Sequence, residues 1–91
     1  MISNDAFQKV KCAIVRKLYM QGCWGKGHLL YIRLTKGIPN QDKIFAKEAA
    51  KELIKMKIMS AKKTKHGIAM YLNKEKLHEI EELIKINNYS Q

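Results

Sequence analysis

Hydrophobic and polar positions separate most clearly between Lys43 and Met56. When each residue is turned by about 100° around a helix axis, one arc collects Phe45, Ala46, Ala49, Ala50, Leu53 and Met56, with Ile54 at its edge. The opposite side collects Lys43, Lys47, Lys51 and Lys55, here called the lysine row, and Ile44 falls among them. This pattern predicts a helix over residues 41–56 that packs on a core with one side and presents the lysine row with the other.

The residues before this segment predict two further helices. Phe7, Val10, Ile14 and Leu18 repeat at helical spacing, which predicts a helix over residues 4–21, capped by Ser3 or Asn4. Residues 22–27 hold three glycines, so we expect an extended connector there that can include a short strand, with Trp24 in the core. Residues 28–36 mix periods of two and four, and a short helix is the favoured interpretation. After the turn at Pro39, Asn40 or Asp42 can cap the next helix.

The residues after Lys57 predict a hairpin and a closing helix. Two extended runs flank Lys65-His66-Gly67, which indicates a β-hairpin over residues 58–72 with Lys62, Lys63 and Lys65 near its tip. In its second strand Ile68, Met70 and Leu72 alternate with Ala69 and Tyr71, so one face can lie on the helices. Asn73 then caps a helix over residues 74–86, whose buried edge is formed by Leu77, Ile80, Leu83 and Ile84.

Charge is distributed unevenly along the chain. The 91 residues, of which 46% are hydrophobic, fit one small domain, and the net charge of +10 suits a phosphate-rich partner or an anionic surface. Between Ala6 and Lys74 only three acids, Asp42, Glu48 and Glu52, stand against sixteen of the 18 basic residues. The closing helix carries most of the other acids, namely Glu75, Glu79, Glu81 and Glu82. The positive field is therefore expected in the body of the chain.

The lysine row has two interpretations. Like charges four residues apart repel by a few tenths of a kcal/mol, a cost that a polyanion would remove. Glu48 and Glu52 each precede a lysine of the row by three residues, a spacing that lets opposite charges meet and offset part of the repulsion. A solvated helix face and a nucleic-acid-binding face are both consistent with this pattern.

Several classes of protein are not indicated. No apolar run approaches the eighteen or so residues of a membrane span, and the N-terminus lacks the apolar core of a secretion signal, so a cytoplasmic location is expected. Cys12 and Cys23 show no Cys-x-x-Cys spacing, so neither a disulfide framework nor a metal site is expected. Residues 25–27 lack the context of a phosphate-binding loop, and the glutamates of the closing helix fit a solvated face. No catalytic residue and no cofactor are predicted.

The order of elements, together with two short motifs, resembles a known superfamily. The motifs are Trp24-Gly25-Lys26-Gly27-His28 and the stretch from Lys65 to Asn73, which reads Lys-His-Gly-Ile-Ala-Met-Tyr-Leu-Asn. With them the chain resembles winged helix-turn-helix proteins, and within these a group of small archaeal proteins. The resemblance implies a mainly helical α+β fold in a single domain over residues 1–91, with a three-helix core, a two-stranded wing and an extra C-terminal helix. Residues 41–56 would be the recognition helix and residues 58–72 the wing.

What the resemblance and the charge imply together is nucleic-acid binding. The expected partner is double-stranded DNA, contacted by a transcriptional regulator through Asn40, Gln41, Lys43, Lys47, Lys51, Lys55, Lys62, Lys63, Lys65 and His66. Lysine neutralises phosphate, whereas only Asn40 and Gln41 suit an adenine edge, so weak sequence preference is expected. The alternatives are an RNA-binding or ribosome-associated protein and a protein-interaction domain. A homodimer through the terminal helices is a further expectation, because one small core need not cover their apolar strip.

Overall fold

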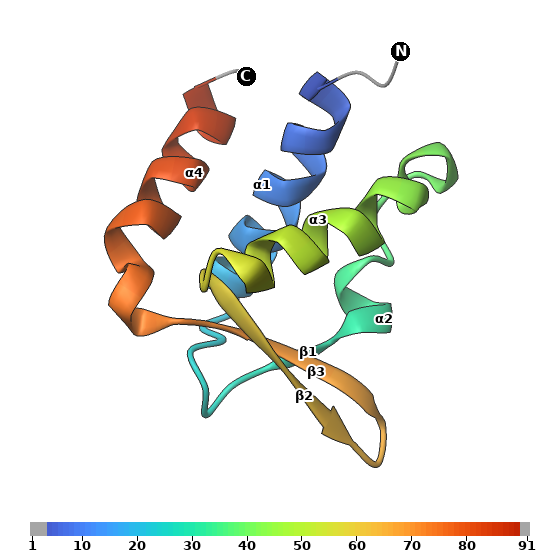
Figure 1. Ribbon diagram of the computed structural model, residues 1–91, viewed down its shortest axis with the longest axis vertical. Helices are drawn as coiled ribbons and strands as arrows, with labels where there is room; N and C mark the ends of the chain where they lie inside the picture. Colours follow the sequence, from blue (N-terminus) through green and yellow to red (C-terminus); the bar gives the residue numbers. More distant parts are fainter. Residues whose placement is uncertain (1–3, 90–91) are drawn as a thin grey trace.

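The fold is built from a helical layer and a small antiparallel sheet at one end of it. A computed structural model describes the backbone of residues 4–89 and the side chains of residues 6–85. The α-helices in this part of the chain are α1 (Asn4–Met20), α2 (Tyr31–Leu34), α3 (Lys43–Lys55) and α4 (Leu77–Tyr89), with single 3-10 turns η1 (Asn40–Asp42) and η2 (Lys74–Lys76). The strands are β1 (Leu29–Leu30), β2 (Met59–Thr64) and β3 (Gly67–Leu72). The chain is thus a mainly helical α+β fold, with the hairpin β2–β3 projecting away from the helices (Figure 1).

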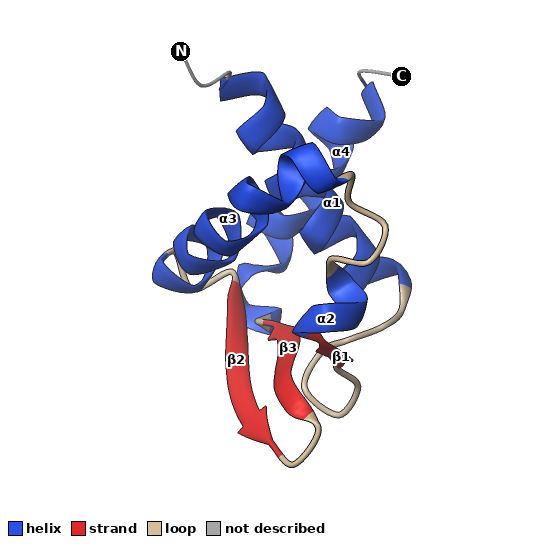
Figure 2. Cartoon of the chain, turned by 90° about the vertical axis from the view of Figure 1, so that its right-hand side faces the viewer, coloured by secondary structure: helices blue, strands red, loops and turns tan. Residues whose placement is uncertain are grey.

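The sheet has β3 in its centre, in the order β1-β3-β2. Residues paired across strands point to the same face, so the register assigns an inner and an outer face. The inner face carries Met59, Met70 and Leu72, which are buried in the core, and the half-buried Leu29. The outer face carries the pairs Ser60–Tyr71 and Lys62–Ala69. Figure 2 shows β1 and β2 on opposite sides of β3, with α2 next to β1.

The core forms where α1 packs against α3, α4 and the sheet. Its largest fully buried side chains come from every layer: Ile14, Val15 and Leu18 of α1, Leu53 of α3, Met59, Met70 and Leu72 of the sheet, and Ile80 of α4. The small residues Ala46, Ala49 and Ala50 let α3 lie close to its neighbours, as the periodicity predicts. Ile44 is 73% exposed, so it stands among the lysines on the surface.

Helices α1 and α3 end in the same hydrogen-bonded motif. After α1, Gly22 has a φ of +67°, and the amides of Gly22 and Cys23 donate to the carbonyls of Tyr19 and Leu18. After α3, the amides of Lys57 and Ile58 donate to the carbonyls of Ile54 and Leu53, and Lys57 has a φ of 66°. Both sets of bonds form a Schellman motif, which favours glycine at its left-handed position. Lys57 therefore holds a backbone conformation that its side chain disfavours.

Asn73 ties the end of α3 to the start of α4. Its side-chain nitrogen donates to the Lys57 carbonyl at 2.8 Å, and its side-chain oxygen accepts from the Glu75 amide at 3.1 Å. Its backbone amide donates to the Ile58 carbonyl at 3.0 Å. The predicted cap is present, although it begins the 3-10 turn η2 rather than α4 itself.

Three sequence-based expectations are wrong. Residues 28–36 form no continuous helix, since Leu29 and Leu30 pair with Met70 and Ala69 of β3 and only Tyr31–Leu34 is helical. Backbone groups of the strand are satisfied by β3, which local periodicity does not reveal. The short strand therefore lies at residues 29–30 and not in the connector 22–27. Asp42 makes no side-chain capping bond to α3, and Pro39 precedes η1 in place of a capping side chain. The chain enters α3 through the Asp42 amide, which donates to the Pro39 carbonyl at 2.9 Å.

The other elements lie close to their expected ranges. α1 ends at Met20, one residue before the expected end at residue 21, while the Ser3 or Asn4 cap lies outside the described side chains. The hairpin occupies residues 59–72, and its strands flank the two-residue turn Lys65-His66. Ile68 is 42% exposed although it belongs to the inner row, because the hairpin tip projects beyond the helices. Trp24 is half-buried and packs edge-on against Tyr19, with 5.8 Å between ring centroids.

Candidate nucleic-acid interface

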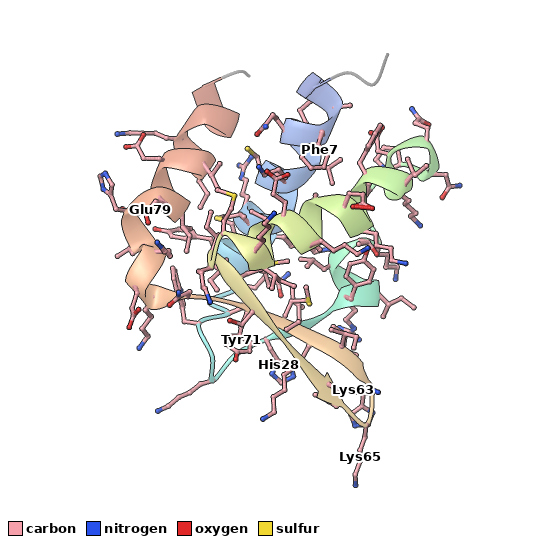
Figure 3. All side chains as sticks on the ribbon, viewed as in Figure 1. Phe7, His28, Lys63, Lys65, Tyr71 and Glu79 are labelled. Atoms are coloured by element: carbon pink, nitrogen blue, oxygen red, sulfur yellow. The ribbon has the colours of Figure 1, made fainter. Side chains whose placement is uncertain are left out.

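All ten residues of the predicted interface are exposed, but they lie on four different parts of the fold. The lysine row occupies α3, and Asn40 and Gln41 lie in the 3-10 turn before it. Lys62 and Lys63 lie on β2, while Lys65 and His66 form the turn of the hairpin. Lys63 and Lys65 stand near the tip of the hairpin, away from the helices (Figure 3).

The lysine row does not run straight along α3. Four residues advance a helix by about 400°, so each lysine is rotated by about 40° from the one before, and the ends of the row diverge by about 120°. Lys51 and Lys55 turn towards the side of α3 that faces Phe7, whereas Lys43 and Lys47 turn towards the opposite side. Phe7 and the hairpin lie on opposite sides of α3 (Figure 3). Lys43 and Lys47 are therefore the members of the row that share a side with the hairpin.

The Phe7 side of α3 contains the two glutamates of this helix, Glu48 and Glu52. A surface pocket of about 590 Å³ is lined there by Phe7, Glu48, Lys51, Glu52, Lys55 and Met56. Within it Lys51 lies 4.0 Å from Glu48, as the three-residue spacing predicts. Glu52 does not pair with Lys55 among the described residues, since it lies 3.5 Å from the Nζ of Lys11 on α1. Of the two lysines of the row on this side of α3, Lys51 therefore has an acidic partner in Glu48, while Glu52 is paired with Lys11.

Lys11 is the one buried charged residue in the part of the chain that the structure describes. Its side chain is 6% exposed, and its ammonium lies over the Phe7 ring at 5.5 Å from the centroid. A buried ammonium needs an anionic partner, so Lys11 holds Glu52 on the Phe7 side of the helix. This contact removes Glu52 from the lysine row, which spacing within α3 alone does not predict.

The tip of the hairpin is fixed by Thr64. Its hydroxyl donates to the Gly67 carbonyl at 2.7 Å and accepts from the His66 amide at 3.1 Å. Gly67 has a φ of +126°, a conformation that a side chain would disfavour. Lys62, Lys63 and Lys65 are consequently presented on a backbone with defined geometry.

The outer face of the sheet adds an aromatic residue that the sequence analysis did not select. Tyr71 pairs with Ser60, and the neighbouring pair on the same face is Lys62–Ala69. Tyr71 is half-buried, and Figure 3 shows it and the exposed His28 at the hairpin. The alternation of the hairpin predicts that Tyr71 faces away from Met70 and Leu72. The sequence does not reveal the register between β3 and β2, and this register places Lys62 on the same face as Tyr71.

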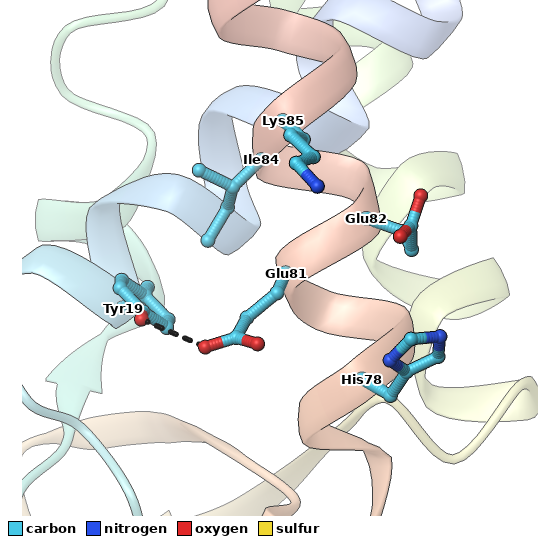
Figure 4. A pocket seen from close by; sticks show the side chains of 6 residues that line it. All are labelled: Tyr19, His78, Glu81, Glu82, Ile84 and Lys85. Atoms are coloured by element: carbon cyan, nitrogen blue, oxygen red, sulfur yellow. Dashed lines mark hydrogen bonds between the residues drawn. The ribbon is translucent and has the colours of Figure 1, made fainter.

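A second pocket lies between α1 and α4 and has a different character. It has a volume of about 350 Å³ and is lined by Tyr19, His78, Glu81, Glu82, Ile84 and Lys85 (Figure 4). The Tyr19 hydroxyl donates to the Glu81 carboxylate at 3.2 Å. This hydrogen bond and the charge of Glu81 raise the pKa of Tyr19 above its ordinary value. The carboxylates that line this pocket make it unsuited to a polyanion.

The apolar strip of α4 is largely covered by the chain itself. Ile80 is fully buried, and Leu83 and Ile84 are half-buried against the core. Leu77 is 44% exposed, so it is the member of the strip that remains most accessible to a second copy.

The two cysteines are single buried thiols and form no disulfide with each other. Cys12 and Cys23 are both buried, and burial raises the pKa of both thiols. No group of three or more metal-binding side chains occurs among the residues that the structure describes. None of the described helices combines the length and apolarity needed to cross a bilayer.

Comparisons with known proteins identify no relative of this chain. No protein-family model matches the chain, and neither the curated proteins nor the solved structures give a match. The order of helices and the three-stranded antiparallel sheet are compatible with a winged-helix layout.

Proposed function

We propose that this protein is a winged helix-turn-helix domain that binds the backbone of double-stranded DNA and acts as a transcriptional regulator. The observation that carries the proposal is a set of five exposed lysines, here called the hairpin-side lysines: Lys43, Lys47, Lys62, Lys63 and Lys65. None of them pairs with a carboxylate among the described residues. Exposed cations without acidic partners remain available to neutralise phosphates.

The dimensions of the elements support this proposal. A helix with its side chains is about 10–12 Å wide, which fits a major groove of about 12 Å. With α3 in the groove, the hairpin would follow the neighbouring backbone as a wing. Ile44, 73% exposed among the lysines, would meet an apolar group such as a thymine methyl. Asn40 and Gln41 lie in the turn that enters α3, where their amides would reach base edges.

The proposal is tested by a salt titration of binding to duplex DNA, followed by fluorescence anisotropy. If the five hairpin-side lysines neutralise about five phosphates, log K falls with log salt at a slope of roughly −4.5. Affinity then drops roughly 500-fold between about 50 and 200 mM salt. Absence of binding at about 50 mM salt, or a slope near zero, would overturn the proposal.

Structured or single-stranded RNA is the second candidate ligand, because the outer sheet face offers an aromatic ring. Tyr71 lies beside the pair Lys62–Ala69, an arrangement that allows a base to stack while its phosphate meets an ammonium. Single-stranded RNA, an RNA hairpin and duplex DNA are compared in the same titration. If RNA is the ligand, Tyr71→Ala weakens RNA binding roughly tenfold, since stacking contributes about 1–3 kcal/mol per base. An equal loss for duplex DNA would argue against stacking.

We also propose that any self-association uses the ends of α1 and α4, where Met20 and Leu77 are exposed. Sedimentation equilibrium of the chain and of Leu77→Gln measures this directly. A dimer that persists in Leu77→Gln would contradict the assignment. If no nucleic acid binds, a protein-interaction role of the acidic α4 surface replaces the DNA proposal.

A further inference from the structure

A basic pocket lies at the β1 edge of the sheet and contains no residue of the predicted interface. It has a volume of about 280 Å³ and is lined by Lys17, Gln21, Leu29, Arg33 and Lys36. Three of the five lining side chains are cationic, one is an amide and none is a carboxylate. One water occupies about 30 Å³ of liquid, so the pocket has room for a tetrahedral oxyanion.

Lys17 is held in this pocket by the backbone of α2. Its Nζ donates to the Arg33 carbonyl at 2.8 Å, and its side chain is half-buried. An ammonium has three N–H donors, so two remain for a ligand after this bond. Because the bond restricts the long side chain, less conformational entropy is lost when an anion binds to it.

Arg33 and Lys36 complete the set of donors. Both are exposed, and neither forms an ion pair with an acid among the described residues. The planar guanidinium of Arg33 can donate two parallel hydrogen bonds to two oxygens of one group, while the ammonium groups act as compact charges on the others. This combination suits a phosphate, which has at least two free charged oxygens, better than a chloride ion.

The pocket is separate from the surface used in the proposed function. Leu29 belongs to β1, at one edge of the sheet, whereas α3 leads into β2 at the other edge. Figure 2 shows β1 and β2 at opposite edges of the sheet, with β3 between them, and none of the residues that line the pocket belongs to α3 or β2. A ligand in the basic pocket would therefore not occupy the positions of Lys43 and Lys47.

We infer that the basic pocket binds a phosphate group. The source of that group is either the backbone of a nucleic acid that extends past the sheet or a free phosphate compound, since both present the same charged oxygens. The inference goes beyond the proposed function, because the pocket can bind inorganic phosphate whether or not α3 contacts DNA.

The test is a titration of the 15N-labelled full chain with inorganic phosphate at constant ionic strength, observed in amide spectra. We expect saturable shifts confined to residues 17–21 and 29–36. Arg33→Gln combined with Lys36→Gln should weaken the binding about tenfold, because each variant removes a charged donor but leaves the carbonyl that holds Lys17. The matched control is Lys9→Gln combined with Lys85→Gln, two exposed lysines outside the pocket, which should change the affinity less than about twofold.

Two outcomes would overturn the inference: shifts spread evenly over all basic surfaces, or an equal loss of affinity in the control. A second titration with duplex DNA distinguishes the sources of the phosphate. If the pocket holds a backbone phosphate, the double variant reduces the salt slope by about 0.9, and if it holds a free phosphate compound, the slope is unchanged. Phosphate binding without any DNA binding would support the pocket and reject the proposed function.

Discussion

The curvature of the lysine row predicts that its two halves contribute unequally to DNA binding. Lys43 and Lys47 share a side with the hairpin and have no acidic partner, whereas Lys51 and Lys55 lie in the pocket with Glu48 and Glu52. Two double variants with the same change in charge are compared. One combines Lys43→Gln and Lys47→Gln, and the other combines Lys51→Gln and Lys55→Gln. If all four lysines formed one contiguous DNA-binding face, both variants would lose the same DNA affinity. The structure predicts a larger loss of affinity for the variant at Lys43 and Lys47.

The magnitude follows from counterion release. One phosphate contact contributes about 0.9 to the slope of log K against log salt. Taking 1 M salt as the concentration at which this contribution vanishes, one contact raises the affinity roughly eightfold at about 0.1 M salt. Loss of Lys43 and Lys47 therefore lowers affinity roughly 60-fold and reduces the slope by about 1.8. Loss of Lys51 and Lys55 should lower affinity less than about tenfold, through the general field alone, with little change in slope.

The assay is fluorescence anisotropy with one duplex over a series of salt concentrations. Circular dichroism of both variants controls for the fold. We expect α3 to be retained in both, because Gln is a good helix former and the exposed pair Lys51–Glu48 contributes less than about 1 kcal/mol. Equal slopes for the two variants would refute the reasoning, as would a larger loss from Lys51 and Lys55.

The remaining predictions concern the residues that hold the fold. Lys57→Gly should raise the free energy of unfolding by about 0.5–1 kcal/mol in urea denaturation, because the relief of a left-handed conformation exceeds the added entropy of the unfolded chain. Gly22→Ala, at the same position of the other Schellman motif, should lower the free energy of unfolding by about 1 kcal/mol. If both substitutions changed the free energy of unfolding in the same direction, the assignment of the motif would be contradicted. Asn73→Ala should cost about 1–2 kcal/mol through two lost side-chain hydrogen bonds, and a loss within error of zero would show that solvent replaces them. The raised pKa of Tyr19 means that the folded state favours the protonated phenol, so its contribution is present below about pH 10 and disappears as the pH rises through the folded pKa. Urea denaturation from pH 8 to 11 should therefore show an extra decrease in the free energy of unfolding for the native chain that is absent in Tyr19→Phe. Identical pH profiles for the two proteins would exclude the contact between Tyr19 and Glu81.

The elements predicted well are those whose pattern is long and local. α3 has thirteen residues, and its alanines and Leu53 mark the buried side without reference to the rest of the chain. The hairpin is similarly local, since its strands are joined by a two-residue turn. Residues 28–36 were assigned wrongly because their structure depends on β3, about forty positions further along the chain. Periodicity in a short window does not record such pairing.

The candidate interface was only partly accessible from the sequence for the same reason. Spacing within α3 predicted the pair Glu48–Lys51, whereas the partner of Glu52 comes from α1. The basic pocket joins residues from α1, β1 and the segment around α2, none of which forms a charge run in the sequence. Exposure of the ten predicted residues follows simply from their polarity.

The position of β2 gives its lysines a further consequence. β2 is an edge strand, and the backbone groups on its free side can pair with another chain. Lys62 and Lys63 place one ammonium group on each face of this strand and repel an identical edge, so they oppose the intermolecular β-pairing that leads to aggregation. The residues that we propose to attract an anionic polymer thus also keep copies of the protein apart, and neutralising them by acetylation would favour fibre-like assembly as well as weaker DNA binding.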